Sequence, residues 1–211
     1  MQHPSNAQRS GKTLLQIPNI LTISRFVLSV VLFSLIFGSS KYEGQNGWFI
    51  AALCTFLIAG ITDLLDGYIA RRCGQETDFG RIADPFVDKI LICGTFIFFV
   101  LYLDGDPYMK SGDYANITGW MVVLIVAREF LISALRGYAE SKKIRFGAIG
   151  WGKRKMFLQS LTICAILAQH AFLVGAREFR IAVTILIWLT VAISLFSGLM
   201  YINRARKVFK I

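Results

Sequence analysis

The sequence predicts an all-α, polytopic membrane protein built as a bundle of six transmembrane helices. Hydrophobic residues make up 55% of the 211 residues and charged residues only 17%, whereas soluble domains commonly carry about 25% charged residues. Apolar stretches of roughly 20 residues are long enough to cross a bilayer. Six such stretches lie near residues 19–37, 48–69, 85–103, 117–138, 156–174 and 181–201.

The domain organisation is simple. Residues 1–16 form a polar N-terminal tail without the short apolar core of a cleavable signal, so we expect the first apolar stretch to remain in the protein. Residues 17–211 contain no internal repeat and no interdomain linker, and are expected to form one six-helix membrane domain.

The lysine and arginine residues predict the orientation, because cytoplasmic loops are enriched in them. The two ends of the chain and the second and fourth loops hold most of these residues. The other loops hold only Lys41, Lys110, Arg177 and Arg180. With six spans, both termini are then cytoplasmic. We expect a multi-pass protein of the cell (cytoplasmic) membrane, with the loop between the second and third spans facing the cytoplasm.

Four cations fall within the predicted spans, where ionisable groups are costly and usually face the interior of the bundle or a wet cavity. These residues are Arg25, Lys89, Arg128 and Arg136. They are candidates for one polar site.

The segment ITDLLDGYIARRCGQETDFGRIADPFVDKI joins the second span to the third and is rich in aspartate. Asp63 and Asp66 share one face at the end of the second helix, because residues three or four apart are neighbours on a helix. Asp84 and Asp88 do the same at the start of the third. A short loop between these helices would bring four carboxylates face to face.

Four such carboxylates would repel one another without a compensating cation. Hard divalent ions such as Mg²⁺ and Mn²⁺ prefer carboxylate oxygens. Two ions about 4 Å apart can bind an attacking and a leaving oxygen at once. We therefore expect the four aspartates to hold two divalent metal ions, Mg²⁺ or Mn²⁺.

The residues between the aspartates suit a bulky phosphate ligand. Gly67 and Ala70 leave little side chain beside the acids, and Gly80 is expected to give a second close approach in the loop. Arg71 offers a planar set of donors for phosphate oxygens. Together with the metal ions, these residues predict a site for a metal-bound diphosphate.

Some of these residues also have a purely structural explanation when each is considered alone. Asp84 followed by Pro85 is typical of a helix N-cap with proline at the first helical position. Arg71 could anchor a helix end among lipid headgroups, and Asp78 is expected to be a solvated loop acid. Capping does not account for Asp63 together with Asp66 at the end of an apolar helix.

The spacing of this segment resembles the signature of the CDP-alcohol phosphotransferase family. All eight defining positions are matched, by Asp63, Asp66, Gly67, Ala70, Arg71, Gly80, Asp84 and Asp88. The resemblance implies six transmembrane helices and a reaction in which a second alcohol displaces CMP from a CDP-alcohol. It also implies that the four aspartates hold two divalent ions and that Asp88 takes the proton from the attacking hydroxyl. The residues implied to contact the CDP moiety or give it clearance are Gly67, Ala70, Arg71, Thr77 and Gly80.

Three further segments resemble the bacterial phosphatidylglycerophosphate synthases of this family. They are IPNILTISR at residues 17–25, AREFLISALR at 127–136 and GKRKMFLQ at 152–159. They imply transfer of a phosphatidyl group from CDP-diacylglycerol to sn-glycerol 3-phosphate, with release of CMP and formation of phosphatidylglycerophosphate. Met156 stands where a threonine is expected, so inositol phosphate, serine or a phosphatidyl lipid stays open as the acceptor.

Two small residues of the first segment, Asn19 and Thr22, lie three apart. The resemblance suggests that they line the nucleotide side of the cleft, as part of the CDP-diacylglycerol site. Asn19 follows Pro18 and could equally do no more than start the helix.

A phosphorylated acceptor agrees with the cations of the fourth and fifth spans. Arg128 and Arg136 are eight apart and share a helix face, while Lys153 and Lys155 enter the fifth span from the cytoplasmic side. We expect these four residues to bind the acceptor phosphate. The alternative is that Arg128 pairs with Glu129 or another buried acid and that the lysines contact anionic lipid.

The expected partners are CDP-diacylglycerol, glycerol 3-phosphate and membrane lipid, with no nucleic acid, and a homodimer stays open. A divalent-cation transporter would also place carboxylates in a membrane bundle. It would need them on a continuous path nearer the middle of the membrane, whereas these lie at one face with Arg71 beside them.

Overall fold

The computed structural model describes residues 17–39, 46–73, 78–102, 117–142, 151–173 and 175–209. All regular secondary structure in these ranges is helical, which confirms the all-α prediction. The helices are α1 (Ile17–Ser39), α2 (Asn46–Cys73), α3 (Asp78–Tyr102), α4 (Gly119–Ser141), α5 (Trp151–Phe172) and α6 (Arg177–Phe209).

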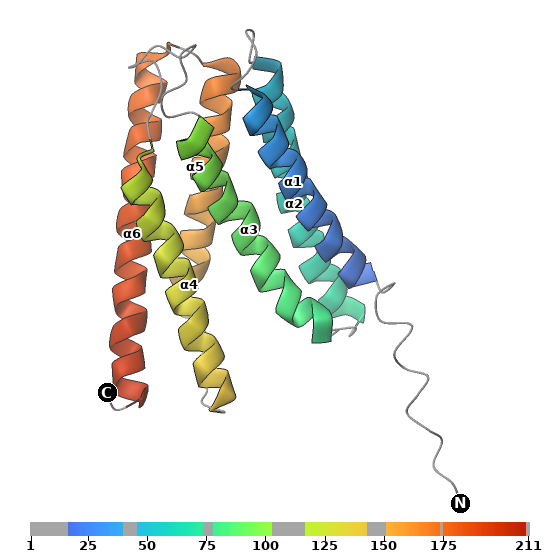
Figure 1. Ribbon diagram of the computed structural model, residues 1–211, viewed down its shortest axis with the longest axis vertical. Helices are drawn as coiled ribbons and strands as arrows, with labels where there is room; N and C mark the ends of the chain where they lie inside the picture. The colour runs from blue at the N-terminus through green and yellow to red at the C-terminus, as the bar shows by residue number, and fades with distance from the viewer. Residues whose placement is uncertain are drawn as a thin grey trace, which may run out of the picture.

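The helices run up and down through one bundle (Figure 1). Helix α1 packs on α2 and α3, α5 packs on α2 and α6, and α4 packs on α6 and α3. Helices α1 and α3 begin, and α2, α4 and α6 end, toward the lower end of the view in Figure 1. The end of α2 and the start of α3 therefore lie beside the start of α1, which brings the aspartate-rich segment next to the first helix.

The bundle has an apolar interior and an apolar exterior. Leu32 and Ile36 of α1 are buried in a core shared with Phe49 of α2 and Phe96 of α3. Large apolar side chains also cover the outside of every helix, and Phe157, for example, is 72% exposed. So much exposed apolar surface is unfavourable in water but matches the hydrocarbon of a bilayer.

Four of the described helices have the length and composition to cross a membrane. The candidate spans are Ile20–Ser39, Asn46–Asp63, Ala83–Tyr102 and Arg177–Arg206. Helices α4 and α5 are long enough, but charged or amide residues interrupt their apolar stretches. Of these residues, Arg128, Gln159 and Gln169 are buried within the bundle. The chain is therefore a multi-pass membrane protein.

Two helix bounds differ from the sequence prediction, and they change the secondary structure around the site. Helix α2 continues to Cys73 and α3 begins at Asp78, so Gly80 and Asp78 lie in a helix and not in a loop. Asp84 lies well inside α3, with Pro85 following it within the same helix. The interpretation of Asp84 as an N-cap is therefore wrong, because a cap residue flanks the first helical turn.

A glycine allows α1 and α3 to pack closely above the aspartates. The ring of Phe33 lies where the Cβ of any larger residue at position 94 would stand. Phe33 in turn stacks on Phe98, with ring centroids 4.7 Å apart. This contact fixes the distance between the two helices that carry Arg25 and Asp88.

Replacing Gly94 by alanine tests this packing. The added methyl group would overlap the Phe33 ring, which is stacked on Phe98, so the ring or the two helices must shift. Overpacking of this kind typically costs about 1–3 kcal/mol. We expect the Gly94→Ala variant to melt about 2–10 °C below the wild type in detergent. Gly60 of α2 is the matched control, because a Cβ added there meets no atom within 4 Å. Equal melting temperatures of the Gly94→Ala and Gly60→Ala variants would contradict the close contact.

Candidate active site

Three of the predicted carboxylates converge on one arginine. Arg25 of α1 contacts the Oδ1 atoms of Asp63 from α2 and of Asp84 and Asp88 from α3. Its Nη2 atom lies 2.9 Å from Asp84, and its Nη1 atom lies 2.6 Å from Asp88 and also bonds to Asp63. The structure thus brings the ends of three helices together through one guanidinium.

The carboxylates and the arginine differ in their access to the surroundings. The side chain of Arg25 is 1% exposed, whereas those of Asp63, Asp84 and Asp88 are 35%, 38% and 31% exposed. The guanidinium therefore lies beneath the carboxylates, on the protein side. The cluster presents oxygen atoms, and not the arginine, to an approaching ligand.

Thr22 belongs to the same cluster. Its hydroxyl donates a hydrogen bond of 2.5 Å to Oδ1 of Asp84. Thr22 is three residues before Arg25 on α1, so both side chains leave the same face of the helix. The sequence predicted a place for Thr22 beside the nucleotide, and the described contact places it against a predicted metal ligand.

A second polar cluster joins α4, α5 and α6. The carboxylate of Glu129 lies 3.0 Å from Nη1 of Arg128 and also pairs with Lys155. Arg128 donates a second hydrogen bond, of 2.7 Å, from its Nη2 atom to the hydroxyl of Ser197. The pairing of Arg128 with Glu129, left open by the sequence, is present. Arg128 and Lys155 lie close together as expected, because the carboxylate of Glu129 pairs with both.

The other two predicted phosphate ligands are placed differently. Arg136 donates a 2.7 Å hydrogen bond to the hydroxyl of Tyr201, and its guanidinium lies 5.4 Å from the centre of that ring. Eight residues span about 12 Å along a helix, so Arg136 lies well below Arg128 on α4. Lys153 lies in the first turn of α5, and its side chain is outside the described part of the chain.

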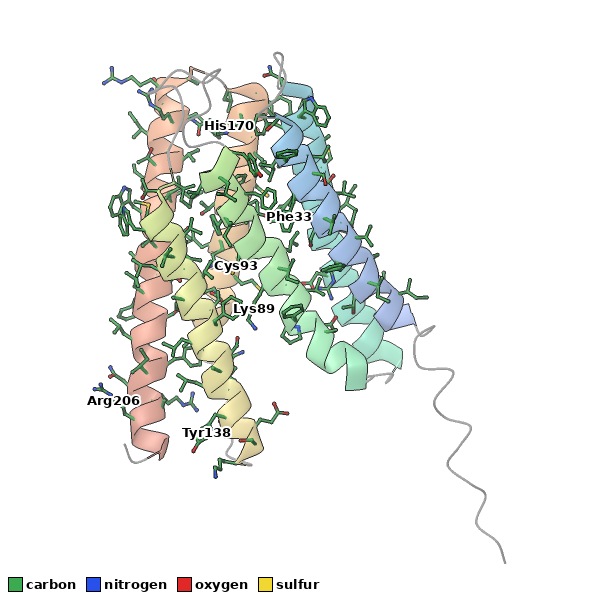
Figure 2. All side chains as sticks on the ribbon, viewed as in Figure 1. Phe33, Lys89, Cys93, Tyr138, His170 and Arg206 are labelled. Atoms are coloured by element: carbon green, nitrogen blue, oxygen red, sulfur yellow. The ribbon has the colours of Figure 1, made fainter. Side chains whose placement is uncertain are left out.

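A cavity of about 60 Å³ lies between the two clusters. Figure 2 shows Lys89 and Cys93 on the side of α3 toward α4, where they form part of its wall. The lining residues are Asp88, Lys89, Ile92, Cys93, Glu129, Lys155, Met156 and Gln159. Among the described residues, Asp88 is the one that belongs both to the carboxylate cluster and to this cavity.

The cavity also contains a polar residue that the sequence analysis did not single out. Gln159 is 1% exposed, and its Nε2 atom has no hydrogen-bond partner within the described residues. A buried amide donor costs free energy unless it is bonded. Its position on the cavity wall suits a donor to a ligand oxygen.

A family model that matches most of the chain shows which family the protein belongs to. The model described as CDP-alcohol phosphatidyltransferase matches residues 15–196, a range that includes the carboxylate cluster, the cavity and every member of the second cluster except Ser197. The chain belongs to the CDP-alcohol phosphatidyltransferase family. It is therefore a transferase of phospholipid biosynthesis, and the resemblance seen in the aspartate signature is confirmed. The family match argues against the divalent-cation transporter, which the carboxylates alone would also allow.

Curated relatives within this family match over nearly their whole length. The CDP-diacylglycerol–glycerol-3-phosphate 3-phosphatidyltransferase of Rickettsia felis is 31% identical, covering 92% of this chain and 97% of the relative. The protein of the same name from Haemophilus influenzae is 30% identical, covering 90% and 93%. A probable phosphatidylglycerophosphate synthase of Mycobacterium tuberculosis is 30% identical, covering 96% and 88%.

The remaining signature residues of this phosphatidyltransferase lie at the same end of the bundle. Asp66, Gly67, Ala70 and Arg71 are in α2 and Gly80 is in α3, with their side chains outside the described set. Asn19 is in α1, and its side chain is also outside the described set. Thr77 lies outside the described residues altogether. Their contacts with the nucleotide stay predictions.

The donor set of this phosphatidyltransferase suits a hard divalent ion. Within the described part, no group of three His, Cys, Asp or Glu side chains is already arranged as a metal site. However, the three carboxylates offer oxygen donors, and Arg25 balances one of their three negative charges. The three carboxylates and Arg25 together keep a net negative charge, which attracts divalent cations. The chemistry of these residues therefore fits Mg²⁺ or Mn²⁺.

Proposed function

We propose that the enzyme transfers the phosphatidyl group of CDP-diacylglycerol to sn-glycerol 3-phosphate, forming phosphatidylglycerophosphate and releasing CMP. The names of the relatives supply this donor and this acceptor. The observation that carries the proposal is the position of Asp88. It links a carboxylate cluster suited to a diphosphate with a cavity whose wall holds Lys155.

The donor binds at the carboxylate cluster. Asp63, Asp66, Asp84 and Asp88 would hold two divalent ions, Mg²⁺ or Mn²⁺, which supply positive charge for the diphosphate and for the leaving CMP. Arg71 binds phosphate oxygens at the end of α2. The other residues assigned to the CDP-diacylglycerol site are Asn19, Thr22, Gly67, Ala70, Thr77 and Gly80.

The acceptor binds in the cavity. Its phosphate is attracted by Lys155 and Arg128, with Lys153 at the start of α5 and Arg136 lower on α4 as further cations. Its hydroxyl then points toward Asp88, which accepts the proton as the oxygen attacks the β-phosphorus of the donor. The bond from that phosphorus to the CMP oxygen breaks, and CMP leaves with the electron pair.

The acyl chains of the donor stay in the bilayer. Ile61 and Phe86 are 56% and 59% exposed and lie two residues from Asp63 and Asp84 along α2 and α3. An apolar border beside half-exposed carboxylates suits a lipid whose headgroup enters the cluster while its chains remain outside. We place all six helices across the membrane, with both termini and this site on the cytoplasmic side, because the helices alternate in direction and basic residues gather at this end.

Met156 is the reason for an alternative acceptor. This residue lines the cavity itself, so the departure from the expected threonine lies where the acceptor would bind. Inositol phosphate carries the same phosphate group and is the alternative. Serine lacks the phosphate that would engage Lys155. A phosphatidyl lipid, the remaining acceptor that the sequence leaves open, would have to keep its acyl chains in the bilayer as the donor does.

The acceptor assignment is tested by offering acceptors one at a time. Purified enzyme with CDP-diacylglycerol and Mg²⁺ or Mn²⁺ should release CMP fastest with glycerol 3-phosphate. Lys155→Gln should raise the KM for that acceptor about 10- to 150-fold, because a hydrogen bond to a charged group is worth about 1.5–3 kcal/mol. The KM for CDP-diacylglycerol should stay nearly unchanged.

The control is Arg206→Gln, because Arg206 is exposed near the end of α6 (Figure 2) and far along the chain from the cavity residues. It should leave both KM values unchanged. Faster CMP release with inositol phosphate or serine would refute the assignment. An unchanged acceptor KM in Lys155→Gln would remove the cavity as the acceptor site.

The role of Asp88 is tested by Asp88→Asn. The amide keeps the shape of the side chain but accepts no proton at neutral pH, so turnover should fall by at least the 10²- to 10⁴-fold that a general base typically contributes. Binding of CDP-diacylglycerol, measured by equilibrium methods, should persist. Glu178→Gln, at the opposite end of the bundle in the first turn of α6, is the matched control. Turnover near the wild-type rate in Asp88→Asn would place the base elsewhere.

A further inference from the structure

Arg25 is a buried cation in a helix that crosses the membrane. It lies within the candidate span Ile20–Ser39, and its side chain is 1% exposed. A charged side chain at such a position is costly unless it is paired. The described partners that compensate this cost are Asp63, Asp84 and Asp88, which are also the carboxylates proposed to hold metal ions.

The geometry places Arg25 and a metal ion in direct electrostatic competition. In all three described contacts the carboxylate uses its Oδ1 atom, so the guanidinium engages one oxygen of each acid from beneath. A divalent ion would reach the same carboxylates from their exposed side. Both cations would then act on the same three carboxylates, and each would repel the other.

We propose that Arg25 is a positioning residue that stands in for the metal ions in the metal-free enzyme. It keeps the carboxylates of α2 and α3 assembled against α1 when no ion is bound, and its charge weakens the binding of the ions. This inference rests on the proposed metal site and adds an opposing role for a residue outside the aspartate signature.

Removal of Arg25 should destabilise the metal-free protein more than the metal-saturated protein. Without the guanidinium, three neighbouring carboxylates repel one another, so the metal-free protein loses stability. Bound metal supplies the missing charge, so the metal-saturated protein loses much less. A ligand that stabilises a variant more than the wild type must bind its folded state more tightly, and metal affinity should therefore rise.

Thermal unfolding in detergent, first with excess chelator and then across a Mn²⁺ titration, measures both quantities. For Arg25→Gln we expect the metal-free melting temperature to fall by about 5 °C or more, with most of the loss recovered at saturating Mn²⁺. A unit charge a few Å away typically changes proton affinity by about 10- to 1000-fold. The Mn²⁺ concentration for half-maximal stabilisation should accordingly fall about tenfold.

Two further variants separate charge from packing. Arg25→Lys keeps the charge but cannot reach three carboxylates at once, so it should lie between Arg25→Gln and the wild type in both quantities. Arg128→Gln removes another buried guanidinium, which bonds to Glu129 and Ser197 and lies over the ring of Tyr201. It should lower the melting temperature by the same amount with and without Mn²⁺.

The inference is overturned if Arg25→Gln loses equal stability with and without Mn²⁺, as a purely structural arginine would. It is also overturned if the variant needs more Mn²⁺ than the wild type, because Arg25 would then assist metal binding. Failure of the metal site itself looks different: the wild-type protein would show no stabilisation by Mn²⁺ or Mg²⁺ and no metal by elemental analysis.

Discussion

The guanidinium of Arg25 is the interaction on which the arrangement of the active site depends. It bonds to acids from both α2 and α3, so one side chain fixes the relative positions of three helix ends. Carboxylates gathered this closely repel one another and cannot all stay ionised without positive charge nearby. The ionised cluster therefore needs a cation, and Arg25 provides one from within the protein.

Helix α3 transmits this constraint to the rest of the bundle. Asp84 and Asp88 face α1, while Lys89, Ile92 and Cys93 face the cavity that α4 and α5 complete. Residues three and four apart share a helix face, and Asp88 lies where the two faces meet. The close contact at Gly94, farther along the same helix, holds α3 on α1. A shift of α3 would therefore displace the donor and acceptor sites together.

The sequence predicts the helices and the gathering of Asp63, Asp84 and Asp88 well, because both follow from local spacing. The place of Asp66 in this cluster stays a prediction. Apolar length locates the six helices, and three- and four-residue intervals place Asp84 beside Asp88. It does not predict the partners of Arg25, which lie 38 to 63 residues away along the chain. Glu129 was visible only as a possible partner of Arg128. Its bond to Lys155 depends on how α4 packs near α5, which no local pattern encodes.

We propose that these carboxylates form the metal site of the phosphatidyltransferase. The most direct measurement is a crystal structure of the enzyme with Mn²⁺ and CDP-diacylglycerol, with anomalous scattering recorded at the manganese edge. We expect anomalous peaks at bonding distance from Asp63, Asp84 and Asp88, beside the diphosphate of the donor. Anomalous density elsewhere, or a diphosphate bound away from these carboxylates with Arg25 still occupying all three, would contradict it.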